Sequence, residues 1–300
     1  MTSPDVVVPP ALLAGKRIVL GVTGGIAAYK AADLASHLVQ QGVSLRVAMS
    51  EAATRFVGPM TFEAITKNRV YTGVFDGWGD GEAGHVTLAS TADAVLVAPA
   101  TADTIAAMAQ GFARDMLTAV LLGTNAPIVV APAMEHNMWY HPATQANISL
   151  LRARGVTIVE PESGRLASGA SGDGRLASRT AIVAAIRGAL ATSGPLARLR
   201  VVVSAGGTHE AIDPVRFIGN RSSGQMGVAI AEAAFDAGAT VTSVLGPTVT
   251  VPPSVGDSVR VESAREMAEA VEAACQEADV LIMAAAVADF RPESTATSKI

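Results

Sequence analysis

The 300-residue sequence has only one cysteine, Cys275, and is poor in aromatic and charged residues. A single cysteine excludes an intramolecular disulfide framework and any zinc site built from several cysteines. Charged residues make up 16% of the chain and hydrophobic residues 50%, which excludes a disordered chain and predicts a substantial core. The net charge of −5 includes no basic block, so we expect no nucleic-acid partner.

Long hydrophobic runs are also missing. No apolar stretch reaches the roughly 18 residues that a membrane helix needs, and the longest candidates, such as Val280–Ala288, suit buried strands. Residues 1–15 contain no basic stretch before their paired prolines, so we expect no signal peptide. These absences predict a soluble, cytoplasmic α/β protein without membrane contact.

Short apolar runs alternate with amphipathic segments in two series, which predicts parallel sheets with right-handed crossovers. In the first series we expect strands at Arg17–Gly21, Ser44–Met49, Ala94–Ala98, Ile128–Ala131 and Val156–Val159, and helices at Ile26–Gln40, Thr104–Gln110, Asp115–Leu122 and Ala181–Leu190. In the second we expect strands at Arg200–Ser204, Thr240–Leu245 and Asp279–Ala284, and helices at Met226–Ala237 and Ala264–Glu277. We therefore predict two Rossmann-like domains in tandem, residues 1–192 and 193–300.

Two features of the sequence do not fit a simple pair of Rossmann-like domains. The glycine- and serine-rich residues 161–180 cannot bury much apolar surface, so we expect a mobile loop there. A three-stranded second domain would leave an open hydrophobic edge. Either a partner covers that edge or the natural protein continues past Ile300, and we favour the second interpretation.

The turn after the first strand, GVTGGIA at Gly21–Ala27, lacks the G-x-G-x-x-G spacing of dinucleotide sites. The second strand leads into Ser50 and Thr54 instead of the acidic residue that holds a ribose diol. Hydroxyls beside a helix N-terminus suit a phosphate monoester, which favours a mononucleotide over NAD. The third strand runs into Pro99–Thr104, at the crevice where doubly wound sheets bind ligands. In both places a plain strand-to-helix turn is the alternative.

His85 differs from the other histidines in its surroundings. It follows the glycine-rich acidic loop DGWGDGEAG and opens a helix, where a neutral imidazole could act as a general base. His37 lies on a helix, whereas His136, His141 and His209 lie in loops.

The second domain has its own phosphate chemistry. Glycines and hydroxyls at Ser204–Thr208 and at Ser222–Gly224 precede a helix and could form a cradle of triphosphate size. The Walker pattern is absent, so this is not a P-loop.

These residues resemble a known family. GVTGGIAAYKAADL, GHVTLASTADAVLVAPATADTIA and PAM…MW resemble flavin-dependent cysteine decarboxylases, and GGTHEAIDPVRFIGNRSSGQMG with AAAVADFRP…KI resembles phosphopantothenate–cysteine ligases. Their order resembles the bifunctional bacterial family of coenzyme A biosynthesis, phosphopantothenoylcysteine decarboxylase/phosphopantothenate–cysteine ligase. The resemblance runs from Lys16 onward.

For the first domain, the resemblance implies a flavodoxin-like flavoprotein that binds FMN and decarboxylates phosphopantothenoylcysteine to 4′-phosphopantetheine. The flavin provides the electron sink, and His85 matches the family base. The matching flavin-binding positions are Thr23, Gly24, Gly25, Ile26, Ser50, Thr54, Pro99, Ala100, Thr101 and Ala102.

For the second domain, the resemblance implies activation of 4′-phosphopantothenate by CTP to an acyl-cytidylate, with Mg²⁺ screening the phosphates, before cysteine displaces CMP. Asn220 would position the acyl-cytidylate; the metal ligands are not identified. The CTP-binding positions are Gly206, Gly207, Thr208, Ser222, Ser223, Gly224, Ala285, Asp289 and Lys299. Family members continue beyond Lys299 with further lysines and a lid, so we expect residues 1–300 alone to lack ligase activity.

Two positions depart from the family. The substrate-binding string P-x-M-N-x-x-M-W carries Glu135 in place of asparagine, between Met134 and Met138. Glu135 would repel the substrate carboxylate unless protonated or turned away, so Asn137 or His136 could take over.

The second departure lies in the substrate clamp, which reads A-C-G-D-x-G-x-G-R in the family. Ser168 stands here in place of the proton-donating cysteine, while Arg175 is retained. A hydroxyl is a weaker acid than a thiol, so another donor or water could complete the reduction.

The resemblance also implies a homo-oligomer: trimers of the flavin domain in a larger particle such as a dodecamer, flavin near subunit boundaries, and dimeric ligase domains. Two alternatives remain. One is a decarboxylase of peptides that end in cysteine, which the fused ligase strings disfavour; the other is a non-catalytic regulatory relative that binds a protein partner, which the changes at Glu135 and Ser168 support.

Overall fold

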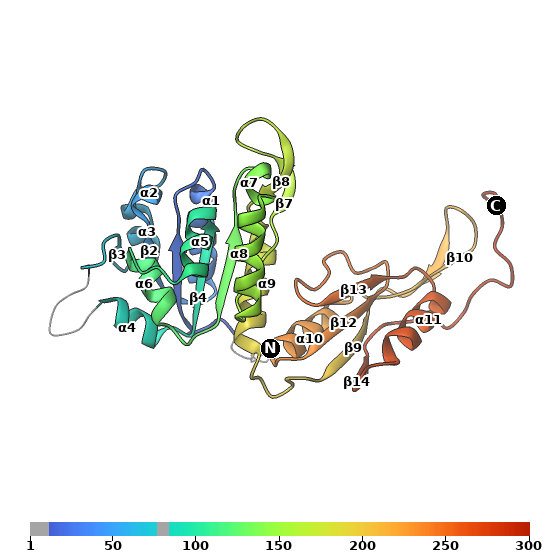
Figure 1. Ribbon diagram of the computed structural model, residues 1–300. Coiled ribbons are helices and arrows are strands. Elements are labelled where there is room, and N and C mark those ends of the chain that lie inside the picture. Colours follow the sequence, from blue (N-terminus) through green and yellow to red (C-terminus); the bar gives the residue numbers. More distant parts are fainter. Residues whose placement is uncertain (1–11, 77–83) are drawn as a thin grey trace. The chain divides into compact units, whose positions relative to one another are not determined.

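A computed structural model describes residues 12–76 and 84–300 (Figure 1). The N-terminal segment up to residue 11 and most of the acidic glycine loop before His85 lie outside the described residues. The chain divides into two compact units, Met1–Leu190 and Ala191–Ile300.

Unit 1 contains a parallel six-stranded sheet in the order β3-β2-β1-β4-β5-β6. Its strands are β1 (Arg17–Val22), β2 (Ser44–Met49), β3 (Val70–Tyr71), β4 (Ala94–Ala100), β5 (Ile128–Pro132) and β6 (Thr157–Ile158). Without the two-residue β3, the order is the 2-1-3-4-5 order of flavodoxin-like folds, in which ligands bind where the strand order reverses. That point lies between β1 and β4.

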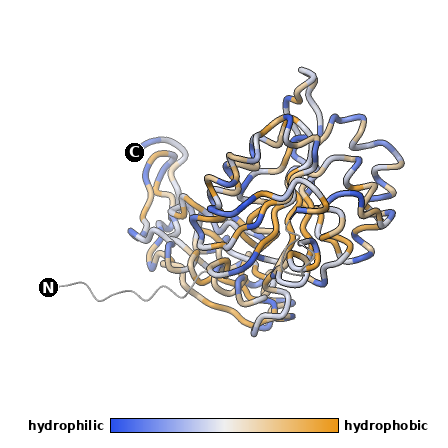
Figure 2. The backbone as a smooth tube through the Cα atoms, turned by 90° about the vertical axis from the view of Figure 1, so that its left-hand side faces the viewer, coloured by the Kyte–Doolittle hydropathy of each residue, from blue (hydrophilic) through white to orange (hydrophobic). Residues whose placement is uncertain are grey.

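Helices cover both faces of this sheet because successive strand residues point to opposite sides. Ile18 and Leu20 belong to one core and Val19 to the other. The first core is covered by α1 (Ala28–Gln40), α3 (Pro59–Thr66) and α9 (Arg179–Ala191). The second is covered by α4 (Gly84–Thr91), α5 (Ala102–Gln110), α6 (Met116–Gly123) and α8 (Pro142–Ala153). Figure 2 shows hydrophobic segments gathered in the interior.

Unit 2 contains a parallel sheet in the order β13-β12-β9-β14. Its elements are β9 (Arg200–Ala205), α10 (Gln225–Asp236), β12 (Thr240–Leu245), β13 (Asp257–Arg260), α11 (Ala264–Cys275), β14 (Val280–Met283) and an antiparallel ribbon of β10 (His209–Ala211) and β11 (Phe217–Gly219). The two helices pack on separate cores. β14 lies at the sheet edge with Val280, Leu281 and Met283 exposed.

The predicted α/β class is confirmed, and every predicted helix and strand ends within two residues of an observed one. The prediction of a mobile loop at residues 161–180 is wrong for this segment. It contains an antiparallel hairpin of β7 (Glu162–Arg165) and β8 (Ser171–Arg175). The two strands pair with each other, and the hairpin docks on the rest of unit 1, where Met134 N donates to Gly174 O at 2.9 Å.

Within residues 12–76 and 84–300, no helix is both long and apolar enough to cross a bilayer.

Candidate functional site

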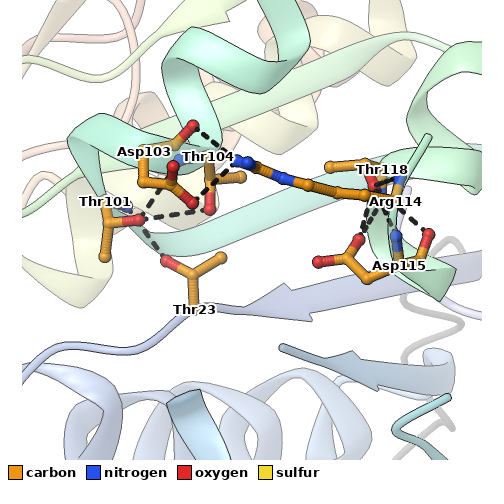
Figure 3. Close-up of polar contacts among 7 residues, drawn as sticks. All are labelled: Thr23, Thr101, Asp103, Thr104, Arg114, Asp115 and Thr118. Atoms are coloured by element: carbon orange, nitrogen blue, oxygen red, sulfur yellow. Dashed lines mark hydrogen bonds and ion pairs between the residues drawn. The ribbon is translucent and has the colours of Figure 1, made fainter. Parts of the chain in front are cut away.

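The loops that follow β1 and β4 are tied together at the reversal point of the sheet (Figure 3). The Thr23 hydroxyl donates to Pro99 O at 2.7 Å and accepts from Thr101 N at 3.0 Å. The Thr101 hydroxyl in turn accepts from Thr104 N and caps α5. Thr23 is only 1% exposed, so it holds the two walls of the crevice together instead of facing a ligand.

A cavity of about 560 Å³ opens beside these loops. The predicted site residues that line it are Gly24, Gly25, Ile26, Thr101, Ala102, Met134, Glu135, Met138 and Arg175. The sequence analysis assigned no role to several other lining residues, among them Tyr29, Lys30, Arg165, Leu166, Ala167 and Leu176. Lys30 lies in the first helical turn after the glycine loop. This position next to the predicted ligand loop could have identified Lys30 as a lining residue from the sequence.

Two adjacent glycines of the first loop have different surroundings. A Cβ on Gly24 would lie 2.3 Å from Ala52 Cβ, so close packing of α2 (Glu51–Thr54) requires glycine there. A Cβ on Gly25 would meet only Thr101 Cγ2, at 3.8 Å, and would otherwise point into open space. Gly25 lines the cavity, so its bare backbone leaves room for a phosphate or a flat ring at the start of α1, as FMN would need.

The remaining predicted flavin positions form the support of this wall. Ser50 caps α2 by accepting from Ala53 N at 3.3 Å, and Thr54 donates to Glu51 O at 2.7 Å. Pro99 and Ala100 belong to β4, and Ala100 is buried. None of these four residues lines the cavity as described.

Glu135 is the N-cap residue of α7 (His136–Trp139) and lines the cavity. Asn137 is exposed and outside the lining. The Nδ1 atom of His136 accepts from Asp173 N at 3.1 Å, so this atom is engaged by the hairpin. Of the three residues considered for the substrate carboxylate, Glu135 is thus the one whose position faces the cavity.

The hairpin is latched to the segment around α7 through Asp173. The Tyr140 hydroxyl donates to this carboxylate at 2.5 Å, and the Ser163 hydroxyl donates to its other oxygen. The Ser163 and Tyr140 hydrogen bonds lower the pKa of Asp173, and the bond to Asp173 raises the pKa of Tyr140. The Asp173 contribution is complete above its unfolded pKa, near 4, and the Tyr140 contribution is complete below its unfolded pKa, near 10, so both contributions are present between about pH 4 and 10.

Tyr140→Phe is expected to loosen the hairpin without unfolding unit 1. We expect amide hydrogen exchange in Glu162–Arg175 to become roughly two- to fivefold faster, a small effect because both side chains are accessible to water. Hydrogen exchange with mass spectrometry measures this change. Tyr71→Phe, on β3, is the control; unchanged exchange in Tyr140→Phe would contradict the latch.

Ser168 lies in the turn at the tip of the hairpin. Its hydroxyl accepts from Ala170 N at 3.3 Å, and the residue is exposed. The neighbouring Ala167 lines the cavity but Ser168 does not. The hairpin therefore brings the clamp segment to the cavity mouth without placing the serine hydroxyl inside it.

His85 is in the first turn of α4, and its Nδ1 atom is buried with no hydrogen-bond partner among the described residues. The cavity lining does not include it. Within unit 1, α4 packs against α6 and lies at the opposite end of the sheet from α7 and the hairpin (Figure 1). One copy of unit 1 therefore does not bring the predicted base to its own cavity.

In unit 2, the predicted nucleotide loop at the end of β9 is brought next to the segment after β14. Ala286 N donates to Gly206 O at 2.7 Å, and Ala288 N donates to the buried Thr208 hydroxyl at 3.0 Å. The Asn220 side-chain amide donates to Ala286 O and Val287 O at 3.3 and 3.0 Å. Asn220, the β9 loop and the segment that begins at Ala285 therefore form one cluster.

The other predicted nucleotide residues differ in their placement. Gly224, in the left-handed conformation with φ of 72°, caps α10 and packs against Gly206, and its N–H donates to the Ser222 hydroxyl. Ser223, Asp289 and Lys299 are exposed. Sequence reasoning missed Thr248, whose hydroxyl accepts from Gly207 N at 2.7 Å and therefore occupies one amide of the predicted phosphate loop.

Part of the string I-D-P-V-R-F is structural. The buried Asp213 carboxylate accepts hydrogen bonds from Val215 N, Arg216 N, the Arg216 guanidinium and Ile300 N. Burial opposes its ionisation, but these bonds hold the pKa of Asp213 well below its usual range. The residue is thus an anchor for the turn between β10 and β11.

Among the described residues, no group of three or more histidine, cysteine, aspartate or glutamate side chains is arranged to hold a metal ion.

The fold and the cavity together define a flavodoxin-like α/β unit with a candidate ligand cavity at the reversal point of its sheet, followed by a second Rossmann-like unit. Residues 9–191 match the family described as Flavoprotein, and residues 196–300 match the DNA/pantothenate metabolism flavoprotein C-terminal domain. The chain is 47% identical over 292 residues to the coenzyme A biosynthesis bifunctional protein CoaBC of Mycolicibacterium smegmatis, covering 96% of this chain and 70% of that protein. It is 44% identical to the CoaBC protein of Bacillus subtilis, covering 96% and 72%.

Solved structures agree for unit 1. A cysteine-to-serine mutant of PPC decarboxylase complexed with pantothenoylaminoethenethiol is 28% identical, with a TM-score of 0.54, over 57% of this chain and 96% of that one. The FMN-dependent cysteine decarboxylase SpaF is 36% identical, with a TM-score of 0.50, over 58% and 99%. The chain belongs to the CoaBC family of bifunctional coenzyme A biosynthesis enzymes, with a decarboxylase domain and a ligase domain.

Proposed function

We propose that unit 1 binds FMN and decarboxylates phosphopantothenoylcysteine to 4′-phosphopantetheine, and that unit 2 forms its substrate from 4′-phosphopantothenate, cysteine and CTP. The observation that carries the first part is the cavity at the reversal point of the sheet, where Gly25 leaves space at the start of α1. FMN-dependent relatives of the same fold support the choice of cofactor.

In this mechanism the chain positions substrate and cofactor in the cavity. The chemistry that FMN would supply when bound is reversible two-electron redox at the thiol side of the substrate, so loss of CO₂ would not leave an unstabilised carbanion. Gly24–Ile26 and Thr101–Ala102 would hold the flavin, and Met134 and Met138 would form the apolar wall around the reacting group. The hairpin would cover the substrate and limit access of water.

His85 would serve as the base in the cavity of a neighbouring copy. Its distance from the cavity of its own unit and the unpartnered Nδ1 atom support this assignment. A homo-oligomer, trimeric in the flavin domain, would then be required for decarboxylation.

In unit 2, the Asn220 cluster would hold the activated acyl group and the nucleotide. Mg²⁺ would arrive with the triphosphate, whose oxygens suit it better than an all-protein site. Calorimetry with CTP, and with ATP as the matched control nucleotide, tests this part. We expect CTP to bind at least tenfold more tightly; equal affinities would contradict the assignment.

The substrate of unit 1 is tested against its nearest alternative. Release of labelled CO₂ is compared for phosphopantothenoylcysteine and for a peptide that ends in cysteine. We expect turnover of the first substrate only. A preference for the peptide would favour the other decarboxylase class, and a protein that neither binds flavin nor turns over either compound would favour the regulatory alternative.

A further inference from the structure

The residues that line the cavity carry more positive than negative charge. Lys30, Arg165 and Arg175 contribute three cations, whereas Glu135 contributes one carboxylate. A cavity wall with excess positive charge favours anionic ligands. The phosphate of FMN, placed at the glycine loop near Ser50, would account for only one anionic group.

Lys30 faces away from the Ser50 side of the glycine loop. It lies in the first turn of α1, and Asp33, one turn further on, forms an ion pair with Arg179 of α9 at 2.9 Å. Residues three apart on a helix share a face, so the Lys30 face of α1 is the one directed at α9 and the hairpin. On its other side, α1 packs beside α3, and the Gly24 loop contacts α2.

Arg175 lines the same cavity as Lys30. It is the last residue of β8, and its guanidinium crosses β7 at Gly164, where an added Cβ would lie 3.2 Å from the Arg175 Nη1 atom. Burial and the nearby positive charge of Arg175 lower the pKa of Lys30, while Glu162 acts in the opposite direction. Two cations that repel each other at a cavity wall are stabilised by an anion bound between them.

We propose that Lys30, together with Arg175, binds the 4′-phosphate of the substrate and makes unit 1 specific for a phosphorylated pantothenoylcysteine. The inference rests on the proposed decarboxylase function. Of the two anionic groups of that substrate, the carboxylate loses its charge as CO₂ leaves. Cations holding it would stabilise the ground state more than the transition state, whereas the phosphate keeps its charge throughout. The cation pair therefore belongs to the phosphate.

The test compares phosphopantothenoylcysteine with pantothenoylcysteine, which lacks only the phosphate. In Lys30→Gln we expect kcat/KM for the phosphorylated substrate to fall about 10- to 100-fold, the range expected for losing a charge-assisted hydrogen bond. We expect kcat/KM for pantothenoylcysteine and the bound FMN content to stay unchanged. Lys30→Arg should retain most of the preference, and Lys67→Gln, at the exposed end of α3, should retain all of it.

An equal fall for both substrates, or loss of FMN from Lys30→Gln, would overturn the inference and place Lys30 at the cofactor or in the fold. Wild-type protein that decarboxylates both substrates equally well would also overturn it, while the proposed function would stand. Calorimetry with 4′-phosphopantetheine and pantetheine separates the two proposals. Selective binding of the phosphorylated compound without decarboxylation would support the phosphate site and contradict the proposed decarboxylase function. Equal binding of the two compounds would contradict the phosphate site.

Discussion

Replacing His85 with asparagine is expected to lower kcat for decarboxylation at least about 100-fold, the contribution typical of a positioned general base. FMN should stay bound, because the residues proposed to hold the flavin lie in the loops Gly24–Ile26 and Thr101–Ala102. The flavin spectrum and the rate of CO₂ release measure the two quantities. His37→Asn, in the last turn of α1, is the matched control and should keep normal turnover.

The neighbouring-copy arrangement predicts complementation. His85→Asn protein should be inactive alone, and so should Gly25→Val protein at FMN concentrations too low to fill its weakened site. When the two are dissociated together and reassembled, a His85 from one copy can meet an intact cavity of the other, so activity should reappear. Mixtures that remain inactive, although they form mixed oligomers, would contradict a base supplied by the neighbouring copy.

Gly25→Val is expected to weaken FMN binding about 10- to 100-fold while unit 1 keeps its fold. The new side chain would meet almost no protein atom, so it should not disturb the fold. It would occupy the space at the start of α1 that FMN needs, and the resulting steric clash would weaken FMN binding. Fluorescence titration with FMN gives the affinity, and thermal unfolding of the flavin-free protein reports the fold.

Gly58→Val provides the control for Gly25→Val. Gly58 precedes α3 with open space around its added Cβ and an ordinary φ of −67°. The Gly58→Val protein should bind FMN with normal affinity. Normal affinity in Gly25→Val as well would show that the glycine loop is a plain strand-to-helix turn, the alternative left open by the sequence.

The sequence predicted the regular parts of both units because their signals are local. Strands such as β1 and β9 are short apolar runs, and the helices between them have one apolar face. β13 was missed because all four of its residues are exposed, and α8 because the first half of its sequence, PATQAN, carries no large apolar residue.

The hairpin shows where composition misleads. Glycine and serine suggested a mobile loop, but Gly172 and Gly174 permit close contact with the His136 ring and with Met134 O. A contact between segments almost 40 residues apart leaves no local pattern. The same holds for Lys30: only the docked hairpin reveals that the first turn of α1 faces Arg175.

The central claim is most directly tested by the product formed from phosphopantothenoylcysteine. The purified protein with its bound flavin would be incubated with this substrate, and CO₂ and the remaining compound would be followed by mass spectrometry. Yellow protein that yields saturated 4′-phosphopantetheine is the predicted result, and an unsaturated enethiol product would mean that the Ser168 clamp fails only in the final reduction. Colourless protein that leaves the substrate unchanged would contradict the account.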